Sequence, residues 1–337
     1  MATLKDIAKE AGVSSVTVSN VINGNYKKVS AQKIELINQI IEKYHYTPNA
    51  TARSLAVKKS NIIGVVVPYI TSYENFLNSP YNAQMLGIIE KNVRNHNYYL
   101  MVKCVEKCTD VIPVIHTWNV DGIIALGVIE DEAIELTKQL DKQPIVFVDT
   151  YTDNPEISNI CIDDERGGYI ATKYLIQKGH REICFVGPDY NDTNVVEKRY
   201  NGYISAMKEC GFESNIRSEL AVSTSFECGL ELAKKMAFAK PNITAIFTTA
   251  DILALGLMQG LRLCGKRVPE DISIIGFDNL IECRYAQPML TTVSQNIEKK
   301  ADMASDLLFK MIENGDKKGG KEMIDVELVE RQSVIPI

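Results

Sequence analysis

The amino-acid sequence predicts an α/β protein with a small helical head at its N-terminus and a larger body of two doubly wound parallel sheets. Three observations predict this arrangement. Apolar residues recur at helical spacing through residues 3–55, whereas beyond residue 60 short apolar runs alternate with longer amphipathic stretches. The chain has 337 residues, more than one ordinary domain needs. Residues 1–60 contain nine of the 37 Lys and Arg residues of the chain but only four of its 43 Asp and Glu residues. The net charge of −6 therefore divides into a basic head and an acidic body, which concentrates the attraction for phosphate in the head.

The head begins with two short amphipathic helices around a glycine-centred turn, TLKDIAKEAGVSSVTVSNVING. Thr3 can cap the first helix, and Asp6 complements the positive end of its dipole. Gly12 supplies the backbone freedom of the turn, and Ser14 can cap the second helix. Small or compact side chains remain on the outer face of the second helix, which suits entry into a DNA major groove or, alternatively, simple solvation. They are Ser15, Val16, Thr17, Ser19 and Asn20.

A third helix and a short fourth one are predicted next. Ser30 can cap a helix that carries apolar residues from Ile34 to Tyr44, Pro48 breaks the chain, and Asn49 or Thr51 can cap a further short helix. With these segments in place the chain resembles the lactose-repressor-type (LacI/GalR) family of transcription regulators. The matching motifs follow the family's order through almost the whole chain: TLKDIAKEAGVS, TVSNVING, YTPNATARSLA, KGHREICFVG, DISIIGFDN and QPMLTTVSQ.

Beyond residue 60 strands and helices are expected to alternate, which predicts parallel sheets covered on both faces. The predicted strands are Ile62–Val67, Tyr98–Val102, Gly122–Leu126, Ile145–Val148, Ile183–Val186, Ala245–Thr248 and Ile272–Phe277. The predicted helices are Ala83–Asn95, Asp131–Leu140, Arg166–Lys178, Val195–Glu209, Phe226–Ala239 and Ile252–Leu263.

The resemblance implies three parts: a helix-turn-helix DNA-binding head at 1–47, a hinge helix and linker at 48–60, and an effector-binding and dimerisation body at 61–337. The body is expected to be two-lobed, like periplasmic sugar-binding proteins, with an N-lobe of 61–162 and 295–320 and a C-lobe of 163–292 and 321–337. The chain would then cross between the lobes near Cys161–Asp164, Leu290–Gln295 and Gly319–Lys321.

Candidate effector residues lie where strands are expected to end, because ligands of open α/β sheets bind beyond the carboxyl ends of the strands. By resemblance, Arg199 of the RYNGY motif and Asp278 match the family's effector-binding Arg and Asp. An Arg fork can donate to two neighbouring hydroxyl oxygens while carboxylates accept from hydroxyls, which suits a polyol. Asp251 also follows a strand and is expected to cap the next helix instead. Further effector contacts are expected from Asp149, Asp163, Gln295 and two residues of an aromatic-rich segment, Tyr69 and Tyr81.

The DNA contacts are expected from the second helix and the hinge. Ser15, Val16 and Asn20 would reach base edges, and Asn20 stands where relatives commonly have Arg, so it would pair with adenine rather than guanine. Residues 49–57 are too short for a helix that is stable alone, so this hinge is expected to fold only on DNA, with Leu55 as a wedge in the minor groove. The full predicted DNA-binding set is Thr3, Ser14, Ser15, Val16, Thr17, Ser19, Asn20, Asn23, Asn49, Ala52, Arg53, Leu55 and Lys58.

These features predict a cytoplasmic, homodimeric repressor that binds a palindromic operator and is controlled by a small effector, with a sugar favoured and a purine-like corepressor or a phosphoprotein partner as alternatives. No segment reads as a signal peptide or membrane span, and no leucine heptad follows the last strand. No cofactor or metal is expected, because the eight cysteines are scattered. An enzyme is the competing class, but none of the four histidines has a catalytic or metal-ligand spacing, and GDKKGGKE has Glu322 where a phosphate loop needs Ser or Thr. A solute receptor fits the body and not the basic head.

Overall fold

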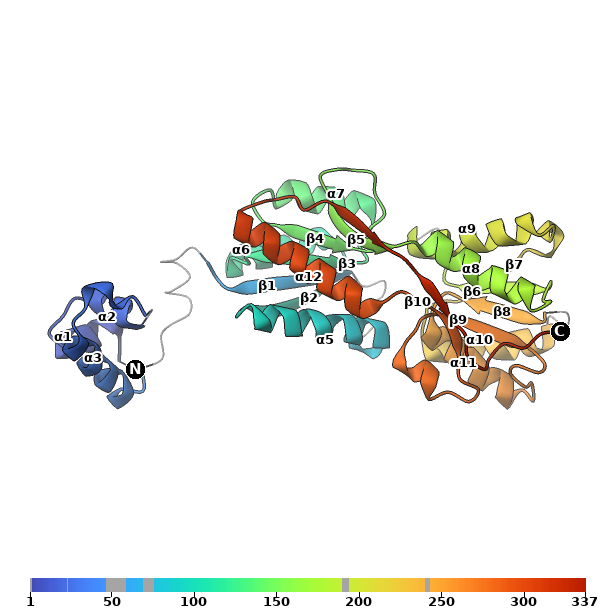
Figure 1. The fold of residues 1–337 in the computed structure, drawn as a ribbon, viewed down its shortest axis with the longest axis horizontal. Helices are drawn as coiled ribbons and strands as arrows, with labels where there is room; N and C mark the ends of the chain where they lie inside the picture. The colour runs from blue at the N-terminus through green and yellow to red at the C-terminus, as the bar shows by residue number, and fades with distance from the viewer. Residues whose placement is uncertain (1, 23, 47–58, 69–75, 190–193, 240–242) are drawn as a thin grey trace. The chain divides into compact units, whose positions relative to one another are not determined.

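The structure is a computed structural model that describes residues 2–22, 24–46, 59–68, 76–189, 194–239 and 243–337. The chain divides into two compact units, residues 1–60 and 61–337. Both belong to the predicted fold class: a helical head, and a body of two mostly parallel six-stranded sheets flanked by helices (Figure 1).

The described part of the head contains three α-helices, α1 (Leu4–Glu10), α2 (Ser15–Ile22) and α3 (Ala31–Lys43), and a short 3₁₀ turn at Tyr26–Lys28. Thr3 and Asp6 form a reciprocal capping box at the start of α1, and Thr17 N donates to Ser14 Oγ over 3.1 Å at the start of α2. Both caps agree with the sequence expectation. Ser30 occupies the cap position of α3 without a side-chain cap bond. The core between the helices is apolar and contains Ile7, Ala8, Ala11, Val18, Val21, Ile37 and Ile40.

The first lobe of the body is a parallel sheet in the order β11-β5-β4-β3-β1-β2. α5 (Pro80–Asn95) and α12 (Ile297–Asn314) pack together on one face, and α6 (Ile112–Trp118) and α7 (Glu130–Gln139) cover the other (Figure 1). Its strands are β1 (Ile62–Pro68), β2 (Tyr99–Val105), β3 (Gly122–Leu126), β4 (Ile145–Val148), β5 (Ser158–Ile162) and β11 (Lys321–Ile324).

The second lobe is a sheet in the order β12-β10-β9-β8-β6-β7, in which β12 alone of the described strands runs antiparallel to its neighbour. Its helices are α8 (Asp164–Gln177), α9 (Asn194–Glu209), α10 (Phe226–Ala239) and α11 (Asp251–Leu263). Its strands are β6 (Ile183–Gly187), β7 (Arg217–Leu220), β8 (Ala245–Thr248), β9 (Ser273–Asp278), β10 (Thr291–Ser294) and β12 (Glu327–Val329).

The four helices of the second lobe form two pairs in which the backbones touch. A methyl group added at Gly168 of α8 would lie 2.0 Å from the carbonyl oxygen of Arg199 on α9, and one at Gly202 would lie 2.0 Å from that of Glu165. In the second pair, a methyl group at Gly256 of α11 would lie 2.1 Å from the carbonyl oxygen of Phe226 on α10. Glycine is therefore needed at these positions for the helices to approach so closely.

The chain passes between the lobes at three points: between Ile162 and Asp164, between Ser294 and Ile297, and between Ile324 and Glu327. The third crossing was predicted at Gly319–Lys321, and that position is wrong, because Lys321–Ile324 pair with β5 in the first sheet. The first lobe therefore extends to residue 324 and not 320. The segment KEMI did not read as a strand because it lies at the sheet edge, where only Ile324 is buried.

Candidate functional site

Two aspartates at strand ends have backbone conformations that are rare outside glycine. Asp149 follows β4 with a φ of 60°, and Asp278 ends β9 with a φ of 127°. Such residues cost conformational energy and persist where the surrounding structure holds them, which is common at ligand sites. They lie at the carboxyl ends of parallel strands in the two different sheets of the body.

Asp149 is held by a buried lysine of the first lobe. Lys300 of α12 has no exposed side-chain surface, and its Nζ lies 2.8 Å from both carboxylate oxygens of Asp149 and 2.5 Å from Gln295 Oε1. Tyr81 of α5 donates its hydroxyl proton to Asp149 Oδ2 over 2.9 Å, and its oxygen lies 3.3 Å from Lys300 Nζ. The ammonium group thus has acceptors for all three of its protons, which a buried lysine requires.

Gln295 connects this cluster to the second lobe. It follows β10 at the second crossing, and its Nε2 donates to Asp278 Oδ1 over 2.5 Å. Burial raises the pKa of the Asp278 carboxyl, and the charge of nearby Asp251 adds to this effect, while Arg199 and the bond from Gln295 oppose it. Asp251 itself accepts from Leu280 N over 2.8 Å and from Thr292 Oγ1 over 2.5 Å. It therefore supports β10 and the loop after β9, whereas the sequence predicted a helix cap.

A second buried cluster surrounds Arg199 of α9. Its Nε donates to Asp164 Oδ1 over 2.6 Å, one terminal nitrogen donates to the carbonyl oxygen of Thr249 over 2.5 Å, and the guanidinium lies 3.7 Å from the ring centroid of Phe277. The hydroxyl of Tyr151, in the first-lobe loop after β4, contacts the other oxygen of Asp164. Among the described residues, Arg199 thus retains N–H donors that no acceptor uses.

The structure brings five of the seven predicted effector residues into these two clusters: Tyr81, Asp149, Arg199, Asp278 and Gln295. Asp163 instead caps α8, because its Oδ1 accepts from Arg166 N over 2.9 Å. Tyr69 lies outside the described residues.

Sequence reasoning missed Lys300, Asp164, Tyr151 and Thr249. A signal for Lys300 exists, because it falls on the apolar face of its helix, next to Ala301 and three residues after Ile297. For Thr249 the signal lies in the structure and not in the sequence. Its hydroxyl is buried and has no hydrogen-bond partner among the described residues.

Val18 and Val21 are the buried residues of α2, and at helical spacing Ser15, Val16, Ser19 and Asn20 lie on the side away from them, whereas Thr17 lies nearer to Val21. Val16 is 69% exposed, and Ser15, Ser19 and Asn20 are partly exposed. Ser14 Oγ and Thr17 Oγ1 lie 2.9 Å apart, and Thr3 is engaged in its capping box, so these three also serve the helix ends. The remaining predicted DNA contacts fall outside the described residues: Asn23, Asn49, Ala52, Arg53, Leu55 and Lys58.

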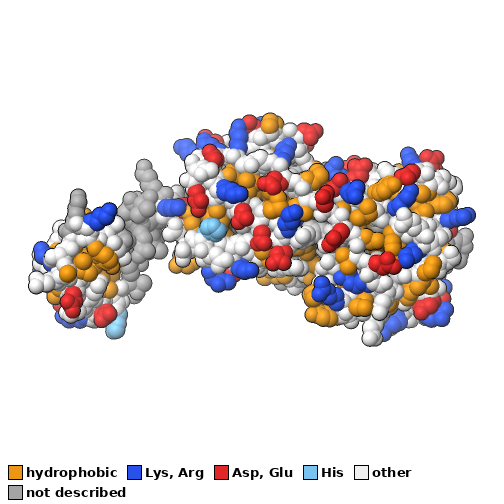
Figure 2. Space-filling view, viewed as in Figure 1, with side chains coloured by type: hydrophobic (Ala, Val, Ile, Leu, Met, Phe, Trp, Pro, Cys, Tyr) orange, Lys and Arg blue, Asp and Glu red, His pale blue; other side chains and the backbone are white. Residues whose placement is uncertain are grey.

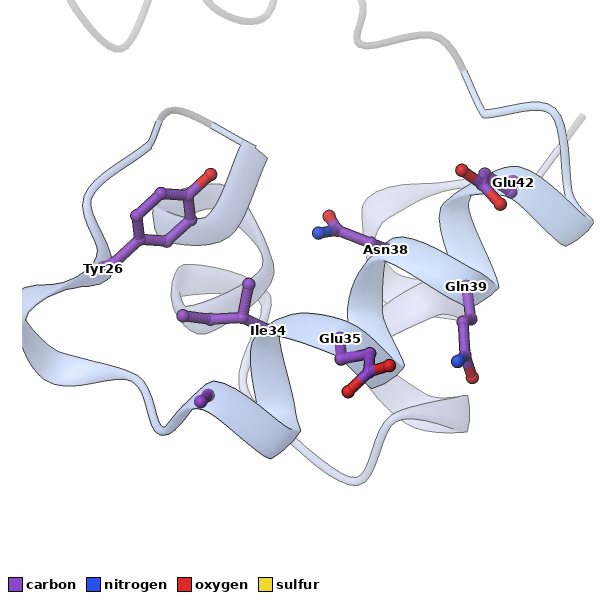
Figure 3. A pocket seen from close by; sticks show the side chains of 7 residues that line it. Tyr26, Ile34, Glu35, Asn38, Gln39 and Glu42 are labelled. Atoms are coloured by element: carbon purple, nitrogen blue, oxygen red, sulfur yellow. The ribbon is translucent and has the colours of Figure 1, made fainter.

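An open groove on another part of the head lies between the 3₁₀ turn and α3 (Figure 3). Its lining includes two carboxylates, Glu35 and Glu42, which disfavour phosphate, so α2 is the better candidate for nucleic-acid contact. No helix in the described ranges is long and apolar enough to cross a membrane. Within the same ranges, His, Cys, Asp and Glu side chains form no group that could hold a metal ion.

Comparison with known proteins finds likeness over the whole chain. Residues 3–49 match the model of bacterial regulatory proteins of the lacI family, and residues 172–334 match a periplasmic binding protein-like domain. The HTH-type transcriptional repressor PurR of Pasteurella multocida is 35% identical over 339 residues, covering 99% of both chains. PurR of Mannheimia succiniciproducens is 33% identical with the same coverage.

Solved structures give the same picture. The lac repressor dimer bound to operator and the anti-inducer ONPF is similar with a TM-score of 0.86 and 25% identity, and 99% of each chain is covered. A LacI family transcriptional regulator from Enterococcus faecium with bound ribose has a TM-score of 0.72 and 28% identity, and the match covers 82% of this chain and 99% of that one.

Proposed function

The chain belongs to the LacI family of DNA-binding transcriptional repressors, and from that premise we propose that it acts in the cytoplasm as a homodimer on a roughly palindromic operator, under the control of an uncharged polyhydroxy effector, a sugar or sugar derivative. One head would bind each half-site, because a single short helix contacts too few bases for genomic specificity. The effector would bind at Arg199, Asp278, Gln295 and Asp149.

The observation that carries the effector proposal is that Arg199 and Asp278, each held by its own partner, lie close enough for each charge to affect the pKa of the other near the carboxyl ends of the second sheet. Within the described ranges, Arg199 has N–H donors left for hydroxyl oxygens, and Asp278 at the end of β9 offers oxygens for hydroxyl protons. Thr249 follows the neighbouring strand β8, and its buried hydroxyl has no partner in the same ranges. Both buried cations, Arg199 and Lys300, are already matched by carboxylates. An anionic effector would therefore find no uncompensated positive charge, which favours a neutral polyol.

A purine-like corepressor is the second candidate, and the full-length match to repressors named PurR favours it. Structures with bound ribose and with D-xylulofuranose, each 28% identical to this chain, favour the sugar.

The coupling between effector binding and operator binding is explained by two hydrogen-bond partners, each shared between a residue of the effector site and a residue of the first lobe. Arg199 shares Asp164 with Tyr151 of the first lobe, and Asp278 shares Gln295 with Lys300 of the first lobe. An effector that bonds to Arg199 or Asp278 therefore changes the contacts between the lobes. Its affinity then differs between two lobe arrangements, which is the condition for allosteric control in either direction, induction or corepression.

The test begins with the full-length protein. Bound duplexes selected from a random pool give the operator, and a thermal-shift screen of neutral sugars, sugar phosphates and purines gives the effector. We expect a neutral sugar to raise the melting temperature and to change operator affinity. Asp278→Asn should abolish both effects of the hit and leave operator binding without effector intact.

Asp271→Asn is the matched control, because Asp271 is an exposed aspartate of the same lobe paired with Arg267. Unchanged effector affinity in both Asp278→Asn and Gln295→Leu would refute the site. A hit confined to purines would replace the sugar with the second candidate.

A further inference from the structure

Lys300 lies in the first turn of α12, directly after the point where the chain crosses from the second sheet into this helix. The crossing consists of Gln295 and Asn296, which join the end of β10 to the start of α12, and Asn296 has a φ of 47°. The side chain of Asn296 accepts from Lys299 N and so fixes the start of the helix. This crossing is one of the three connections between the lobes. The angle between β10 and α12 at the crossing therefore helps to set the lobes relative to each other.

α12 belongs firmly to the first lobe. Asn92 of α5 donates to Asp302 over 2.8 Å, and the rings of His96 and Phe309 stack with 3.7 Å between their centroids. Lys300 therefore extends from a fixed helix. On the other side of the crossing, Ser294 pairs with Asp278 in the register of β10 and β9, so the Asp278 backbone belongs to the second sheet.

Lys300 also decides how the amide of Gln295 is oriented. An ammonium group can only donate, so the atom of Gln295 that lies 2.5 Å from Lys300 Nζ must be the carbonyl oxygen. The NH₂ group is then directed to Asp278, which accepts it. Without a donor at position 300 the amide could rotate and would no longer be held between the two lobes.

We propose that Lys300 is a positioning residue of the effector site: through Gln295 it ties Asp149 of the first sheet to Asp278 of the second and so fixes the crossing between the lobes before any effector binds. An effector that takes over the bond to Asp278 releases Gln295 and frees this crossing. The inference rests on the proposed function for the identity of the effector site.

The experiment measures backbone hydrogen exchange of the free full-length protein and needs neither DNA nor effector. Lys300→Met alone would leave the partly buried Asp149 without its cation, so the test variant is Lys300→Met with Asp149→Asn. This variant removes both charges and keeps an amino acid that tolerates the conformation at 149. We expect amides of residues 294–300 to exchange at least tenfold faster than in the wild type. Amides in the centres of both sheets should be unchanged.

The matched control is Lys299→Met, the same substitution at the neighbouring exposed residue, which should exchange as the wild type does. A second variant, Gln295→Leu, keeps the Lys300–Asp149 ion pair and should loosen the same amides. Combining Gln295→Leu with the double variant should raise the exchange rates little further, since both variants break the same connection between Lys300 and Asp278. Effects that add in full would overturn the proposal. Wild-type exchange in Gln295→Leu would overturn it even if the double variant failed to fold.

Failure here is distinguishable from failure of the proposed function. Loss of operator binding or of an effector response concerns the repressor function, whereas the exchange rates report the crossing alone.

Discussion

The ion pair of Arg199 and Asp164 is buried, with 8% of the Arg side chain and none of the Asp side chain exposed. Removing one partner of such a pair leaves an uncompensated charge. We expect Arg199→Ala to lower the free energy of unfolding by about 3–5 kcal/mol, measured by urea denaturation. Loss of effector binding in this variant would therefore not by itself identify an effector contact.

Arg199→Met combined with Asp164→Asn separates the two roles. It removes both charges, so most of the stability should return while the effector-dependent thermal shift remains absent. Recovery of effector binding together with stability would show that Arg199 is structural only.

His180 is a buried histidine outside both clusters. Its Nε2 lies 3.1 Å from the carbonyl oxygen of Ile335, so this nitrogen carries the proton, and Nδ1 accepts from the hydroxyl of Thr244 over 3.0 Å. Burial lowers the pKa of His180, and the bond to Ile335 opposes this only in part. The unfolded chain therefore takes up a proton at a higher pH than the folded chain does.

It follows that His180 costs no stability above about pH 6.5, and that stability is lost as the pH falls through the unfolded pKa toward the lower folded one. Relative to His180→Gln, the wild type should lose up to about 1.4 kcal/mol of unfolding free energy per pH unit in that range. His116→Gln, the same substitution at an exposed histidine, is the matched control variant. Equal slopes for wild type and His180→Gln would contradict the prediction.

Asn20 is the residue of α2 whose identity predicts a base preference. A bidentate Asn–adenine pair is worth about 1–3 kcal/mol of discrimination, whereas Arg prefers guanine. Selection from a random pool should give an A·T pair at the Asn20 position, and Asn20→Arg should shift that position toward G·C. If both proteins select the same half-site, Asn20 contacts no base.

At the scale of helices, the glycine contact between α8 and α9 holds Asp164 and Arg199 at bonding distance. Gly168→Ala forces the backbone of α9 away at Arg199 itself. We expect a loss of about 1–3 kcal/mol of stability from overpacking, together with loss of the effector response. Gly256→Ala makes an equally close clash, between α10 and α11. It should lose similar stability and keep the effector response, and loss of the response in both variants would mean that the helix pair has no particular role.

The sequence predicted the strands whose residues are mostly apolar, because an apolar composition indicates burial. All seven apolar runs are strands, and six of them are buried in their sheets. The seventh, β2, lies at a sheet edge and is largely exposed. The missed strands β7 and β11 lie at sheet edges and carry polar residues. β10 is buried and yet reads TTVS, because Asp251 accepts from Thr292 and satisfies the polar group. A local sequence pattern cannot predict hydrogen-bond partners that are distant in sequence. For this reason the role of Lys300 was not predicted, since its acceptor Asp149 is 151 residues away.

At the scale of the whole molecule, charge separates the tasks of head and body. On the visible face of the body, acidic and basic side chains are interspersed (Figure 2), and the excess of Lys and Arg in residues 1–60 makes the head the basic part. Operator affinity should therefore fall steeply with salt, by about 10³–10⁵ between 50 and 200 mM if a dimer contacts roughly 6–10 phosphates.

The affinity for a neutral effector provides the internal control, because it should stay nearly constant over the same salt range. Fluorescence anisotropy of labelled operator and calorimetry of the effector measure the two. Operator affinity independent of salt would contradict a head that binds through phosphate contacts.

The return of the chain to the first lobe also sets an order of assembly during synthesis. Five strands of the second lobe are complete once β10 has been made, but the first lobe still lacks α12 and β11. A growing chain can therefore finish most of its second lobe while the earlier-made sheet still exposes the apolar face that α12 will cover. N-terminal domains usually fold first; here the first lobe cannot be completed until most of the second lobe has been synthesised, because α12 and β11 follow β10 in the sequence.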